Sequence, residues 1–219
     1  MSLRFARVSL VAALLLLPAS SSRAQNIFNL HDAGNVAAFG YYVGPYHGLN
    51  LTVAPGGPTF AMFCVDFAHE VWIGESWSAY ITPLAWDLDA HTRGGNAELT
   101  QYREAAWLST QFSLAPTSQW GNIHATIWQL MTPGLAGEPT PSSSYWLNLA
   151  NTHYLDAGVN FYNQFALVTP TNRSDPSSAQ EFLIHTTTTP EPAEMALFGT
   201  GLGALGLLGV WRRRKASQG

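Results

Sequence analysis

The side chains of this chain best suited to covalent chemistry are a single cysteine, Cys64, and two histidines, His69 and His124. A thiol beside an imidazole can act as a nucleophile, because the imidazole helps to generate the thiolate. Cys64 paired with His124 or His69 is therefore one hypothesis, a Cys-His hydrolase. The sequence around Cys64 carries no local signature of a cysteine nucleophile, and so we do not expect an enzyme. With one cysteine, no intramolecular disulfide can form.

Three further side chains near Cys64 are of types that bind metal ions. Asp66, His69 and Glu70 follow the cysteine closely in the sequence. Their spacing does not match a standard set of metal ligands, and a His-Glu pair after a strand is more simply a solvated turn. We therefore expect neither a metal nor another cofactor.

The segment around Cys64 has the pattern of a buried strand. The run Thr59–Phe67 is apolar on both alternating faces, which is typical of a strand covered on both sides. Alternation places Cys64 on the same face as Phe60, Met62 and Asp66. A lone cysteine in such a strand usually acts as a small hydrophobic side chain.

His124 lies in a segment with helical periodicity. Large apolar side chains share its face at helical spacing: Trp120, Ile127, Trp128 and Met131. His124 should therefore point into the core, where a neutral imidazole normally finds a hydrogen-bond partner. Cys64 is a candidate for that contact.

The other patterns place strands on either side of a helical region. Strands are predicted at Val36–Val43, Leu49–Val53, Val71–Ile81, Gln164–Thr169 and Glu181–Thr186. Helices are predicted at Ala97–Phe112 after an Asn96 cap and at Gln119–Met131 after a Ser118 cap. A short third helix is predicted to start within Ser142–Ser144 and to run through Tyr145, Trp146 and Leu149. This order predicts a single α+β domain over residues 25–186, with a β-sandwich or barrel-like core and an inserted helical subdomain.

The first 24 residues have the composition of a signal peptide. Arg4 and Arg7 precede the apolar stretch Val8–Leu17, and Ser22-Arg23-Ala24 places small residues where a signal peptidase cuts. We expect cleavage after Ala24 and export of the chain.

The last segment, residues 187–219, contains a short motif, an apolar run and a basic cluster, in the sequence typical of a sorting signal. Pro190-Glu191-Pro192 precedes an almost uncharged apolar run, Met195–Trp211. A basic cluster follows: Arg212, Arg213, Arg214 and Lys215. As a helix the run would extend roughly 25 Å, close to the ~30 Å hydrocarbon core of a bilayer. We expect a transmembrane helix, with the basic cluster left in the cytoplasm.

These three parts, in this order, resemble the PEP-CTERM tail of exported bacterial proteins. The resemblance implies cleavage at or near Pro190-Glu191-Pro192 by exosortase. It implies a precursor anchored in the inner membrane and a mature form at the cell surface or in the extracellular matrix. In Gram-negative bacteria such proteins are associated with exopolysaccharide. A permanent membrane anchor is the alternative that composition alone leaves open.

The two end segments hold most of the positive charge. The chain has ten lysines and arginines, of which only Arg93, Arg103 and Arg173 fall within residues 25–186, and none of those residues is lysine. The exported part is therefore acidic. Nucleic acid as a partner is disfavoured, because it requires a basic surface.

Two short motifs in the central part resemble those of bacterial thioester domains, which are surface adhesion modules. The motifs are Phe63-Cys64-Val65-Asp66 and Ile123-His124-Ala125-Thr126-Ile127-Trp128. In that family a cysteine thiol on a strand and a glutamine amide on a facing helix condense to an internal thioester, which can capture an amine. The resemblance implies a thioester-like exported domain.

The chain departs from that family at one position. His124 stands where the family has its glutamine, and an imidazole has no amide carbonyl with which to form a thioester. Gln119 and Gln129 each lie five residues away, which rotates them off the face of His124. We therefore expect the scaffold without the covalent bond.

These features predict an exported protein that acts by adhesion or interaction, with a polysaccharide or a surface protein as its ligand. Tryptophans favour a sugar ligand because aromatic faces stack on carbohydrate, although at these spacings they more often form the core. The residues concerned are Trp72, Trp77, Trp86, Trp120 and Trp146. A covalent thioester adhesin that uses another glutamine is the first alternative, and the Cys-His hydrolase is the second.

Overall fold

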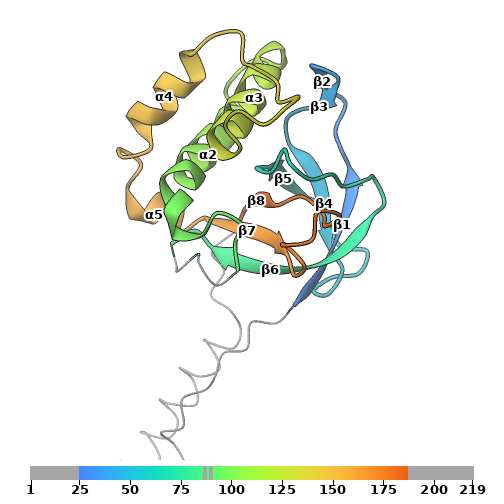
Figure 1. Ribbon diagram of the computed structural model, residues 1–219. Helices are drawn as coiled ribbons and strands as arrows, with labels where there is room; N and C mark the ends of the chain where they lie inside the picture. The colour runs from blue at the N-terminus through green and yellow to red at the C-terminus, as the bar shows by residue number, and fades with distance from the viewer. Residues whose placement is uncertain (1–24, 86–87, 89–90, 187–219) are drawn as a thin grey trace, which may run out of the picture.

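Six strands form a closed antiparallel barrel in the order β1, β4, β5, β8, β7, β6 (Figure 1). The computed structural model describes residues 25–85, 88 and 91–186, so the expected signal peptide and sorting tail lie outside the described residues. The strands are β1 (Asn26–Asp32), β4 (Tyr46–Asn50), β5 (Phe60–Cys64), β6 (Ser76–Pro83), β7 (Phe165–Pro170) and β8 (Phe182–His185). Pairing of β1 with β6 closes the barrel.

The helices are inserted between β6 and β7 and cover one side of the barrel (Figure 1). They are α2 (Leu99–Gln111), α3 (Trp120–Met131), α4 (Tyr145–His153) and α5 (Gly158–Tyr162), with 3-10 turns η1 (Gly95–Glu98) and η2 (Thr117–Gln119) before α2 and α3. The predicted α+β class is confirmed, with a barrel core and a helical insertion.

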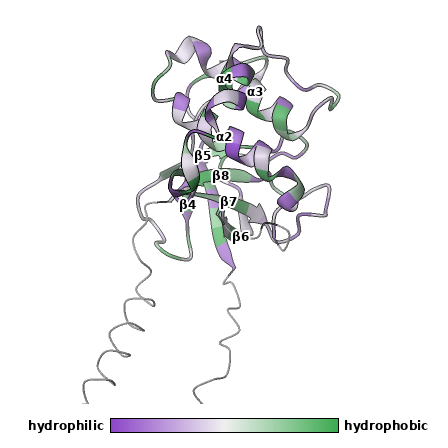
Figure 2. Cartoon of the chain, turned by 90° about the vertical axis from the view of Figure 1, so that its left-hand side faces the viewer, coloured by the Kyte–Doolittle hydropathy of each residue, from purple (hydrophilic) through white to green (hydrophobic). Residues whose placement is uncertain are grey.

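Strand β5 lies between two hydrophobic cores, which is why its sequence is apolar on both faces. Met62 and Cys64 face the barrel interior, where they pack with Phe28 and Phe182. Phe63, in contrast, belongs to the core between the barrel and the helices. In Figure 2 strands β7 and β8 appear mainly hydrophobic, while α2, α3 and α4 show both hydrophobic and hydrophilic residues. The predicted double burial of this strand is confirmed.

The predicted strand Val36–Val43 is instead a small hairpin, β2 (Ala37–Ala38) paired with β3 (Tyr41–Tyr42). Phe39 and Gly40 form its turn, with φ of 58° and 88°. Positive φ at both central residues is the geometry of a type I′ turn, which reverses the chain within two residues. The hairpin lies on α3, because a Cβ added at Gly121 would be only 2.6 Å from the Ala38 Cβ.

Two other strand predictions were displaced along the chain. The strand expected at Leu49–Val53 ends at Asn50, whose Oδ1 accepts hydrogen bonds from the backbone of the next turn at Thr52 and Val53. The strand expected from Val71 begins only at Ser76. Trp72 is in a turn there, where its backbone N–H donates to Glu75 Oε2 at 2.9 Å.

The expected helix caps were wrong, although α2 and α3 lie within two residues of their predicted bounds, and α4 runs four residues beyond the predicted Leu149. Both α2 and α3 begin through a 3-10 turn, and neither has a side-chain cap. The Asn96 Oδ1 accepts the Leu88 N–H instead. Strand β1 and helix α5 were not predicted.

Among the helices of residues 25–186 that the structure describes, none is long and apolar enough to cross a membrane. The predicted transmembrane run at Met195–Trp211 lies outside those residues.

Candidate functional site

Cys64 and His124 meet where the end of strand β5 faces helix α3. Both residues are fully buried. The His124 Nε2 lies 3.1 Å from the backbone carbonyl oxygen of Cys64. One helical turn further along α3, the Trp128 Nε1–H donates to the Cys64 Sγ at 3.4 Å. The two motif positions are therefore in direct contact, sixty residues apart in the sequence.

The hydrogen bonds of His124 fix its protonation state. The Gly44 backbone N–H donates to His124 Nδ1 at 2.9 Å, so Nδ1 carries no proton. The proton of the neutral ring must then be on Nε2, which donates it to the Cys64 carbonyl. Burial lowers the pKa of His124 to about 4, so the ring is neutral at neutral pH. Neither nitrogen is available to take a proton from a thiol.

The Cys64 thiol is likewise held in its neutral form. It donates to the backbone oxygen of Asp66 at 3.3 Å and accepts from Trp128. Burial, and then the charge of the nearby Asp66 carboxylate, raise the pKa of the thiol to about 12. A protonated, buried thiol is neither a nucleophile nor a metal ligand. The geometry therefore does not support the Cys64–His124 hydrolase hypothesis.

Aromatic rings enclose the imidazole. The centroid of the His124 ring lies 4.3 Å from that of Trp128 and 5.7 Å from those of Tyr46 and Phe112. These rings come from α3, the barrel strand β4 and the end of α2. They keep water from the two hydrogen bonds of His124, which strengthens both bonds in the low-dielectric interior.

Gly44 is required by its place between the hairpin and α3. Its φ of +104° is unfavourable for other residues, and a Cβ there would lie 2.5 Å from Trp120 Cε3. Glycine lets the backbone approach α3 closely enough for its N–H to reach His124. His124 thereby bridges the segment before β4 and the end of β5.

The two glutamines nearest His124, Gln119 at the end of η2 and Gln129 in α3, are hydrogen-bonded elsewhere or face solvent. The Gln119 Oε1 accepts a hydrogen bond from Trp146 Nε1 at 3.3 Å, and Gln129 is exposed. Neither shares the buried environment of Cys64, in agreement with the helical rotation expected from the sequence.

A second buried polar group lies next to Cys64 and was not predicted from the sequence. It consists of Asp66, Arg93, Glu181 and His69. The Asp66 carboxylate lies 2.8 Å from Arg93 Nε and 2.9 Å from His69 Nδ1. The Arg93 guanidinium also donates to Ser178 Oγ and to the Ala179 carbonyl oxygen. Arg93 thus connects the end of β5 to the loop before β8.

Glu181 occupies the centre of this group and is 1% exposed. Its carboxylate accepts hydrogen bonds from the Thr169 hydroxyl, the Tyr102 hydroxyl and the Arg93 backbone N–H. Burial raises the pKa of Glu181, while these three donors act against the increase. Tyr102 lies on α2 and Thr169 on β7, so Glu181 joins the helices to the barrel.

One sequence signal pointed to this group. Asp66 was expected on the buried face of its strand, and residues 25–186 contain only three arginines, which offer few partners for a buried carboxylate. What the sequence did not indicate is which arginine approaches it.

The solvated turn predicted at His69 and Glu70 was half wrong. Glu70 is exposed as expected. The His69 side chain is only 16% exposed, because it lies against Asp66. Its Nε2 is 3.3 Å from the Arg93 Nη1, which can only donate, so the proton of the ring is on Nδ1 and points at Asp66. Within the described ranges, no group of three or more His, Cys, Asp or Glu side chains is arranged to hold a metal ion.

The tryptophans divide between the core and the surface. Trp77 and Trp146 are buried, and Trp120 is half-buried. Trp72 is 72% exposed at the turn before β6. Trp86 lies outside the described residues.

Comparisons with protein-family models, with curated proteins and with solved structures find no match to this chain. What the site can do chemically is therefore inferred from its geometry. Cys64 and His124 form a closed, neutral, hydrogen-bonded contact that fastens helix α3 to the barrel.

Proposed function

We propose that this chain is an exported protein of the cell surface or extracellular matrix, which acts by adhesion or interaction without a covalent bond to its target. One observation carries the proposal. His124 occupies the position opposite Cys64, and both of its ring nitrogens are used in hydrogen bonds to the backbone. The contact is thereby suited to hold the fold and not to react.

The chemistry of a thioester explains why a histidine, and not a glutamine, at position 124 matters. The bond forms when a thiol sulfur attacks a carboxamide carbon and ammonia leaves. The imidazole of His124 offers no carbonyl carbon. The Cys64 thiol keeps its proton, and its sulfur already accepts the Trp128 N–H. A protein built in this way binds through its surface.

The sequence at the two ends supports the proposed destination. A signal peptide at residues 1–24, and a PEP motif, apolar run and basic cluster in that order at residues 187–219, are the marks of export and of sorting by exosortase. Signal peptidase and exosortase are the proposed processing partners. The proposed precursor is held in the inner membrane through the apolar run until cleavage.

The proposed sorting is tested by fractionating cells that express the full chain. We expect a shortened mature form at the cell surface or in the matrix. Replacing Pro190, Glu191 and Pro192 by alanine should leave an unshortened chain in the inner membrane, whereas the matched change of Thr187 and Thr188 to alanine should be processed normally. A wild-type chain that stays at full length in the membrane would identify a permanent anchor and contradict the proposal.

A further inference from the structure

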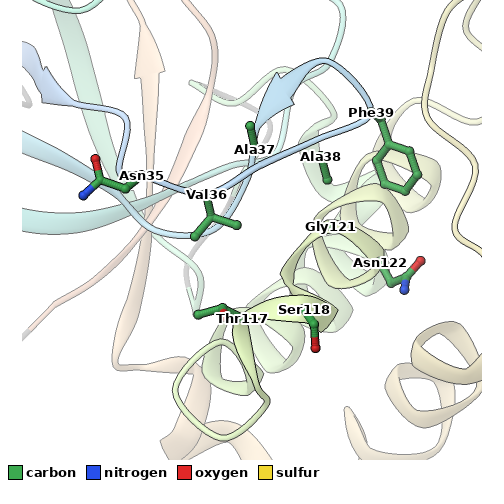
Figure 3. A pocket seen from close by; sticks show the side chains of 9 residues that line it. All are labelled: Asn35, Val36, Ala37, Ala38, Phe39, Thr117, Ser118, Gly121 and Asn122. Atoms are coloured by element: carbon green, nitrogen blue, oxygen red, sulfur yellow. The ribbon is translucent and has the colours of Figure 1, made fainter.

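Two depressions lie side by side at the start of helix α3. The first has a volume of about 450 Å³ and lies between the β2–β3 hairpin and the start of α3 (Figure 3). Its lining includes Asn35, Phe39, Ser118 and Asn122. The second, of about 470 Å³, lies between the segment that joins α2 to α3 and the start of α4, and its lining includes Gln119, Asn122, Ser142 and Tyr145. Both volumes are typical of small-ligand sites, which span ~300–1,000 Å³.

Asn122 is common to both depressions and has a fixed orientation. Its Oδ1 accepts hydrogen bonds from the Ser142 N–H at 2.9 Å and from the Ser142 hydroxyl at 2.8 Å. The Nδ2 group, which only donates, has no hydrogen-bond partner among the residues that the structure describes. Asn122 is therefore oriented by one neighbour and keeps its donors for a ligand.

The lining carries no charged side chain in either depression. Its polar groups are amides and hydroxyls, which pair equally well with donors and acceptors. An anionic ligand would find no arginine or lysine here.

Phe39 is held in a backbone conformation that its side chain does not favour. Its φ of 58° belongs to the first position of a type I′ turn, where asparagine, aspartate or glycine is usual. A bulky residue in this region is an outlier, and such outliers gather at functional sites. Phe39 is 49% exposed, and Figure 3 shows its ring projecting over α3 beside Gly121. Tyr145 is similarly exposed at the second depression.

We propose that these two depressions form one site for an uncharged polysaccharide, which lies across Asn122 and packs on Phe39 and Tyr145. Sugar hydroxyls would pair with the amides and hydroxyls of the lining, and the apolar faces of sugar rings would pack on the aromatic rings. This site deepens the proposed function, on which it rests, by naming the ligand class and the residues that contact it.

The test is affinity electrophoresis of the mature protein recovered from cells, in gels that contain a neutral glucan, mannan or galactan. Gels with alginate, an acidic polysaccharide, and with gelatin, a protein, serve as counter-probes. We expect retardation by at least one neutral polysaccharide. Phe39→Asn and Tyr145→Ala should each weaken that binding about tenfold, an effect typical of losing an aromatic contact.

Two controls separate binding from folding. Asparagine suits the φ of position 39, so Phe39→Asn should keep or raise the melting temperature while it weakens binding. Trp72→Ala removes an exposed aromatic ring that lines neither depression and should leave binding unchanged. Absence of retardation by every neutral polysaccharide, retardation only by alginate or gelatin, or full binding by both site variants would overturn the site. A protein that still reaches the surface or matrix in those cases would leave the proposed function standing.

Discussion

The His124 imidazole donates to the backbone of Cys64 and accepts from the backbone of Gly44, at 3.1 Å and 2.9 Å. One side chain of helix α3 therefore ties together two barrel segments that lie twenty residues apart in the sequence. A glutamine could make the same two hydrogen bonds, since its amide also has one donor group and one acceptor. Unlike a glutamine, the histidine can gain a proton as the pH falls, and it has no carboxamide carbonyl with which a thiol could form a thioester.

Acidification should destabilise the fold through His124. Its pKa of about 4 in the folded chain lies below the ordinary 6.5, so between these values the unfolded chain binds a proton that the folded chain does not. The free energy of unfolding should therefore fall by about 2 kcal/mol between about pH 7 and about pH 5. Urea unfolding curves at the two pH values measure this.

The buried Glu181 acts with the opposite sign, because its raised pKa favours the folded state as the pH falls. The acid-induced loss of stability is therefore compared between the wild type and His124→Gln, whose amide does not titrate. The mass of the variant is first shown to match its sequence, so that a thioester between the introduced amide and Cys64 is excluded. The variant should lose less stability on acidification than the wild type. Equal losses in the two proteins would remove His124 as the cause.

Replacing Gly44 by alanine should loosen the contact between α3 and the barrel. The added Cβ would meet Trp120 at 2.5 Å and would occupy a φ of +104°. We expect a loss of about 3 kcal/mol in the free energy of unfolding. Gly56→Ala is the matched control, because its φ of +75° is also positive but nothing lies within 4 Å of the added atom. That control should lose only about 1 kcal/mol. Equal losses would show that the clash with Trp120 is unimportant.

Removal of the Arg93 guanidinium should strongly lower the free energy of unfolding, because it breaks a buried ion pair. Arg93→Met leaves the Asp66 carboxylate, which is 4% exposed, without its cation. Breaking a buried ion pair on one side costs about 3–5 kcal/mol. Thermal and urea unfolding measure the loss. The exposed acidic neighbour supplies a control, since Glu70→Gln should change stability by under about 0.5 kcal/mol. A loss for Arg93→Met as small as that of the control would contradict the role of the ion pair.

The Cys64 thiol should resist modification in the folded protein. Its pKa of about 12 and its complete burial leave almost no accessible thiolate at neutral pH. Iodoacetamide should therefore modify Cys64 slowly in buffer and fully in concentrated urea, as measured by mass. Rapid modification of the native protein would indicate an accessible thiolate and would revive the nucleophile hypothesis.

The sequence predicted those features that depend on local periodicity. The strand around Cys64 and the helix around His124 were found because apolar residues recur at periods of two and of 3.6. The placement of the helices as an insertion followed from the order of the elements. The hairpin at Phe39 was missed because a phenylalanine gives no turn signal, and only Gly40 marked the reversal.

The features that escaped prediction depend on tertiary contact. Asp66, Arg93 and Glu181 come from separate segments, and their pairing has no periodic pattern in the sequence. His69 was expected in solvent because nothing local shows that Arg93 and Asp66 enclose it. The depressions on either side of Asn122 likewise combine the hairpin, the start of α3 and the segment before α4.

The intact mass of the mature protein, measured before and after incubation with methylamine, tests the central claim most directly. The account predicts a mass equal to that of the plain processed sequence, no addition of methylamine, and full alkylation of Cys64 after unfolding. A mass lighter by one ammonia, together with addition of methylamine, would show an internal thioester and would contradict a non-covalent contact between Cys64 and His124.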